Sequence, residues 1–260
     1  MADFVLVRKS RNIASSAVHL FLNLLLGIGT VMITILSGNP ALGIILVLTS
    51  KWRVFAVRAR YLWLNIKANL VDIIVGLSVV ILTYHAGAAV LPVDFVLAGF
   101  YVMWLLVIKS KSSEVAIMAQ ALIAVFLGVS ATVFMTTSLD PVVLSLICFI
   151  IGYSASRHIL AQSSDKDFTL STLVCGLVFA EVSLISSFWT IIYTFGASGI
   201  RIPQLAIILT IFAFVYIYVR QAVVKYQEDF RFRHILGPVL FGTVLIAIIL
   251  LGFSNPIFNL

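Results

Sequence analysis

Long apolar stretches recur along this chain, separated by short segments that hold nearly all of its charged residues. Most stretches approach the ~20 residues that a helix needs to cross the ~30 Å hydrocarbon core of a membrane. Lipid accepts such an apolar exterior, provided that each span satisfies its own backbone hydrogen bonds. About nine predicted spans lie near residues 13-36, 41-56, 69-90, 93-109, 114-137, 141-157, 168-194, 202-220 and 236-254.

Composition indicates the same class of protein. Of the 260 residues, 62% are apolar and 10% are charged, against about half and a quarter in soluble domains. A soluble fold would need a charged surface that this chain lacks. We therefore predict an all-α, polytopic transmembrane bundle in which residues 1-260 form a single integral membrane domain.

The distribution of basic residues predicts the orientation. With nine spans and the amino terminus inside, every Lys and Arg except Arg201 falls on the inner side, as the positive-inside rule requires. If the short stretch 41-56 were re-entrant, every later loop would change sides and this bias would be lost. The carboxyl terminus is therefore expected outside. The short loops and the absence of an N-x-Ser/Thr site favour a bacterial cytoplasmic membrane.

The loop after the second stretch carries a basic patch interleaved with Trp and Tyr residues, and its members are Lys51, Arg53, Arg58 and Arg60. This mixture suits a segment that lies in anionic lipid headgroups; the alternative is a dedicated binding patch. The net charge of +7 does not indicate nucleic acid, because the basic residues are spread over several short loops.

Glu181 is the most unusual residue within a predicted span. It lies ~20 Å along a helix that begins at Phe168, close to the predicted bilayer centre, where a charge costs on the order of 3 kcal/mol. Three explanations are open: a neutral carboxyl that faces another helix of this protein, a carrier of protons or cations, or a contact for a partner's span.

Two other predicted helices have a polar face. In the first span this face holds Asn12, Ser16, His19, Asn23, Gly27 and Thr30, and in the third it holds Asn65, Asn69, Asp72 and Gly76. The first face predicts either a close-packed helix interface or one wall of a polar pathway. Asp72 predicts either an ion pair with a nearby base such as Lys67 or a proton relay with His19.

Glu181, Asp72, His19, Asn23 and Asn69 are therefore the candidate intramembrane polar or ion site. Cys148, Gly152 and Ser156 form a small-residue face that predicts close helix packing, and Gly196 to Gly199 predict a tight outer turn.

Motifs for enzymatic chemistry are missing from the sequence. It has no H-E-x-x-H motif and no phosphate-binding loop, and its four histidines are scattered. We therefore expect no catalytic residues, metal or cofactor. The first hypothesis is a transporter or channel for small solutes, ions or protons. The alternatives are a non-catalytic subunit that assembles with a membrane protein partner or as a homo-oligomer, and, third, a lipid-acting enzyme.

Overall fold

The computed structural model describes residues 2–86, 91–136, 140–161, 168–195, 200–226 and 231–252, with side chains from Ala17 onward except those of Leu91 and Phe195. Seven helices in this part of the chain are long and apolar enough to cross a membrane. They are α1 (Ala2–Ser37, apolar from Ala17), α4 (Ala59–Ala86), α6 (Glu114–Thr136), α7 (Pro141–Leu160), α8 (Phe168–Ser186), α9 (Gln204–Tyr226) and α10 (Arg233–Gly252).

Two shorter apolar segments occupy the positions of the predicted second and fourth spans. The first is α2 (Pro40–Ser50), followed by the single turn α3 (Trp52–Phe55), and the second is α5 (Leu91–Met103), which continues as the π-helix η1 (Trp104–Ile108). Since α2 is only ~16 Å long, a total of nine spans remains a prediction. The ends predicted at residues 87–90, 137 and 253–254 lie outside the described residues.

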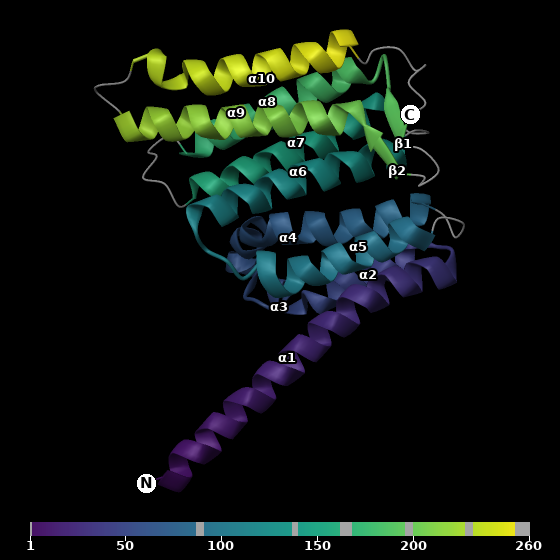
Figure 1. Ribbon diagram of the computed structural model, residues 1–260, viewed down its shortest axis with the longest axis vertical. Helices are drawn as coiled ribbons and strands as arrows, with labels where there is room; N and C mark the ends of the chain where they lie inside the picture. The colour runs from purple at the N-terminus through teal and green to yellow at the C-terminus, as the bar shows by residue number, and fades with distance from the viewer. Residues whose placement is uncertain are drawn as a thin grey trace.

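Successive segments alternate in direction, so their ends gather on two sides (Figure 1). We call one side the basic end, where α2, η1, α7 and α9 finish. We call the other the hairpin end, because it carries the only strands in the described chain, β1 (Ile192–Phe195) and β2 (Ile200–Pro203), which pair antiparallel.

The hairpin changes the predicted boundary of the seventh span. Helix α8 ends at Ser186 and not at residue 194, and a turn leads into β1. The run from Thr190 to Phe195 is rich in β-branched and aromatic residues, which favour a strand. The predicted turn at Gly196 to Gly199 lies outside the described residues.

Two apolar cores hold the helices together. Val125, Phe179 and Leu209 belong to one core, formed by α6, α7, α8 and α9. The other core lies among α1, α4, α5, η1 and one side of α6, and includes Val75 and Tyr101. Helix α10 packs against α9 at the edge of the bundle, and the amino-terminal half of α1 extends away from the other helices (Figure 1).

Helices α2 and α7 begin with the same capping arrangement. The side chains of Asn39 and Asp140 each accept a hydrogen bond from the backbone N–H two residues on, and a proline occupies the first helical position.

We expect Asp140→Ala to lower the free energy of unfolding by about 1 kcal/mol, because the Val142 N–H then loses its acceptor. Chemical denaturation in detergent measures this loss, and Asp140→Asn should retain most of the stability.

Candidate intramembrane polar site

A buried cluster of charged groups lies where α2, α4 and η1 meet. The Asp72 carboxylate accepts hydrogen bonds from the Lys51 ammonium, from Lys109 Nζ at 2.5 Å and from Trp104 Nε1 at 3.0 Å. Asp72 and Lys51 are each 7% exposed, whereas the Lys109 side chain is 46% exposed. Two lysines thus share one carboxylate, so the cluster keeps one net positive charge, and only Lys109 opens toward the basic end.

Each lysine caps the end of a helical segment. Lys51 closes α2 and precedes α3, and its own N–H is bonded to carbonyls of the α2 end. The Lys109 N–H donates to the Trp104 carbonyl, five residues earlier, which is the π-helical hydrogen bond. π-segments occur frequently at functional sites, and interrupted helices bind substrates and ions in many transporters.

The structure assigns Asp72 other partners than those expected from sequence. Lys67 is five residues before Asp72, so the two side chains leave the helix in different directions, and Lys67 lies over the Trp63 and Tyr153 rings. His19 is exposed and hydrogen bonds with Asn23 on its own helix. The structure therefore does not bring His19 to Asp72.

Several other described residues of these polar faces hold neighbouring segments together, whereas the side chains of Asn12 and Ser16 lie outside the described part of the chain. Asn65 donates to the Val54 carbonyl and so ties α4 to α3, whereas Asn69 donates to the Asn65 carbonyl, one turn earlier in α4 itself. On α1, Gly27 and Thr30 are buried, and a Cβ at Gly27 would lie 2.6 Å from Val102. The close-packed interface predicted for the first span thus applies to this later part of its face.

The predicted basic patch divides into two groups. Lys51 is buried with Asp72, whereas Arg53, Arg58 and Arg60 are exposed. Trp52 and Trp63 are also exposed, by 61% and 66%. This exposed part of the patch suits lipid headgroups, and binding of anionic lipid there remains a prediction.

Glu181 lies apart from the Asp72 cluster, on the side of α8 that faces away from the bundle. Because α8 ends at Ser186, Glu181 is ~20 Å from one end of the helix and ~8 Å from the other. It therefore lies nearer to the hairpin end than the predicted span implied. No ion pair joins it to another described side chain.

Sequence inspection missed a set of buried polar groups on α4 and α5. Asp94, Tyr101 and Thr83 are 3%, 0% and 2% exposed. Both Asp94 carboxylate oxygens, the Tyr101 hydroxyl and the Thr83 hydroxyl have no hydrogen-bond partner among the described residues. Buried polar groups are almost always paired, so several unpaired groups on two packed helices are exceptional.

These groups extend toward the Asp72 cluster. On α5, Asp94 and Tyr101 are seven residues apart, hence on one side of the helix and ~10 Å from each other along its axis. On α4, Asp72 and Thr83 share a side with Gly76. A Cβ at Gly76 would lie 2.9 Å from the Tyr101 hydroxyl, so this hydroxyl lies one turn from Asp72.

Gln120 and His158 connect this region to the rest of the bundle. The Gln120 amide donates to the carbonyls of Ile108 and Lys111 at 2.6 and 2.9 Å. Its oxygen lies 2.8 Å from His158 Nε2. The segment that carries Lys109 is thereby fastened to α6 and α7. No sequence motif marks these residues, because their contacts join separate helices.

Packing closes the cluster toward the hairpin end. Val75, Val79 and Val80 on α4 are fully buried, as is Val47 on α2. Among the described residues, these valines separate the charged cluster from the hairpin end in this conformation. The only exposed part of the charged cluster is Lys109, at the basic end.

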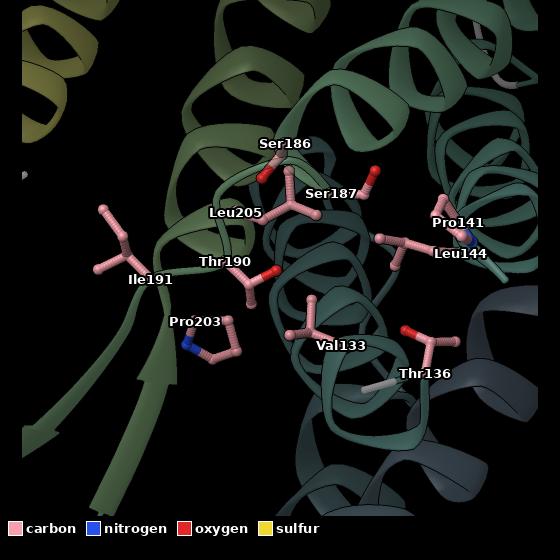
Figure 2. Close-up of a pocket in the computed structure, with 10 residues that line it drawn as sticks. All are labelled: Val133, Thr136, Pro141, Leu144, Ser186, Ser187, Thr190, Ile191, Pro203 and Leu205. Atoms are coloured by element: carbon pink, nitrogen blue, oxygen red, sulfur yellow. The ribbon is translucent and has the colours of Figure 1, made fainter. Parts of the chain in front are cut away.

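Two cavities open at the hairpin end. One, of about 210 Å³, lies among α6, α7, α8 and β2, and its polar groups include hydroxyls of Thr136, Ser187 and Thr190 (Figure 2). The other, of about 230 Å³, is bordered by Leu82 and His85 of α4 and by Val93 of α5. The second cavity therefore adjoins the helices that carry Thr83 and Asp94.

Among the described residues, no group of three His, Cys, Asp or Glu side chains is arranged to hold a metal ion. The seven long apolar helices indicate that the chain is a helical membrane protein. The chain matches no known protein family, no curated protein and no solved structure.

Proposed function

We propose that this protein moves protons across its membrane along the interface between α4 and α5. The observation that carries the proposal is the set of unpaired buried groups on these two helices, Asp94, Thr83 and Tyr101, which extends to the Asp72 cluster. Carboxylates and hydroxyls exchange protons, and intramembrane acids are frequent members of proton relays.

The Asp72 cluster is suited to control this route at the basic end. Lys51 and Lys109 stabilise the ionised form of Asp72. Arrival of a proton would weaken both ion pairs and so free the break between α2 and α3 at Lys51 and the π-helical end of the α5 segment at η1. The π-segment and the break after α2 are the elements that can absorb such a change.

The test uses Tyr101→Phe, with proton entry into sealed proteoliposomes followed by a trapped pH-sensitive dye under an imposed pH gradient. Valinomycin and potassium prevent a membrane potential from opposing the flux. We expect Tyr101→Phe to lower the rate at least about tenfold, equivalent to ~1.4 kcal/mol on the barrier. Its stability should be unchanged or higher, because the hydroxyl that is removed has no partner.

Tyr84→Phe is the matched control, since Tyr84 is on the same helix pair but 43% exposed. It should conduct protons as the unsubstituted protein does. Proton entry no faster than in protein-free liposomes would contradict the proposed function. Equal rates in the two tyrosine variants would exclude the route through Tyr101.

A further inference from the structure

We infer that the outward side of α8 is a docking surface for a transmembrane helix of a partner protein, and that this helix carries a Lys or Arg facing Glu181. The surface consists of residues separated alternately by four and three positions, namely Leu170, Val174, Leu177, Glu181 and Leu184. All five are exposed, and the opposite side of α8, with Cys175 and Phe179, packs into the bundle.

The spacing of the surface fits a helix as its occupant. Alternate steps of four and three keep residues on one line when two helices pack at the small crossing angle common in membranes. Lipid accepts the apolar residues of this side, which also include Leu173 and Ile185, but it offers no hydrogen bond to Glu181 at this depth. A polar residue on the line is instead the feature that fixes the register of paired helices.

The position of Glu181 argues against exposure to lipid or to water. The residue is ~8 Å from the end of α8 at Ser186. Side chains on a helix point toward its amino terminus, which for α8 is the distant basic end. The carboxyl group is therefore directed toward the middle of the membrane, where an unpaired acid is costly whether ionised or neutral.

Charge complementarity distinguishes a partner from a second copy. Two copies in one membrane have the same orientation, so pairing α8 with α8 would place one Glu181 against the other. Two carboxylates at one site cannot both ionise without strong repulsion. A partner helix with a basic residue at the same depth neutralises Glu181 and covers the apolar residues beside it.

The experiment uses a defined probe, a leucine-rich transmembrane peptide of about 20 residues that carries a single lysine in its outer third. Energy transfer between the labelled peptide and the labelled full-length protein is measured in lipid vesicles. We expect the peptide to bind the unsubstituted protein and to lose roughly tenfold in apparent affinity for Glu181→Gln. The same peptide with leucine in place of lysine should not distinguish the two proteins.

Glu114→Gln is the control variant, because Glu114 is an exposed carboxylate at the start of α6, outside the α8 surface. It should bind the lysine peptide normally. Equal binding of the peptide to Glu181→Gln and to the unsubstituted protein would overturn the inference. So would self-association of labelled protein copies that Glu181→Gln abolishes, since the surface would then belong to a second copy.

Discussion

Replacing Asp72 with leucine is expected to lower the free energy of unfolding by about 3–5 kcal/mol, the cost of breaking a buried ion pair by removing one partner. Lys51 would remain 7% exposed with no carboxylate to neutralise it. The Trp104 N–H would also lose its acceptor. Reversible unfolding in mixed micelles, followed by tryptophan fluorescence, measures this loss.

A second substitution, added to Asp72→Leu, tests whether the unpaired charge on Lys51 causes the loss of stability. Lys51→Met combined with Asp72→Leu removes both buried charges and should recover much of the stability, since apolar replacement of a whole buried pair is often nearly neutral. Lys109→Met should cost less than Asp72→Leu, because Lys109 is 46% exposed and reaches water. If the double variant is no more stable than Asp72→Leu alone, the uncompensated charge on Lys51 is not the source of the loss.

Substitution of Gly152 is expected to have the second largest effect. A Cβ at this position would lie 2.5 Å from Cγ and 2.9 Å from Cβ of Phe179, and Phe179 is fully buried. The aromatic ring cannot move aside without disturbing the contact between α7 and α8. Gly152→Ala should therefore destabilise the protein by about 1–3 kcal/mol, and Gly152→Val by more.

Gly99→Ala is the matched control for Gly152→Ala. Gly99 is also within a helix, but a Cβ there meets nothing within 4 Å. Alanine should stabilise the helix at this position by about 0.5–1 kcal/mol, because it has less backbone freedom to lose on folding. A destabilisation of equal size in the two variants would show that helix propensity or lipid contact, and not the Phe179 contact, determines the result at Gly152.

The residues around Gly152 also show what a sequence pattern can predict. Cys148, Gly152 and Ser156 recur every four positions, which indicated a small-residue packing face, and all three are buried in the structure. The pattern did not indicate the opposing residue. Phe179 is on another helix, and its approach to Gly152 depends on how α7 and α8 pack.

The polar residues also show that a sequence can mark an unusual residue without indicating which residues it contacts. Asp72 was singled out because an acid inside an apolar stretch is costly at any position in the bundle. Its partners could not be read from sequence, because Lys51 and Lys109 are 21 and 37 residues away in the chain. Asp94 and Tyr101 gave no signal, since a carboxylate near a predicted loop and a tyrosine in a span are both ordinary.

The sequence by itself determined that the chain is a helical membrane protein and where most of its helices lie. That information is local, because lipid requires each span to be apolar and to satisfy its own backbone hydrogen bonds. Only the tertiary structure decided which side of each helix is covered. It buried Asp72 between two lysines, left Glu181 facing outward and ended α8 at Ser186 to form the hairpin. These outcomes depend on contacts between segments that are distant in the chain, and such contacts cannot be predicted from the order of residues along one helix.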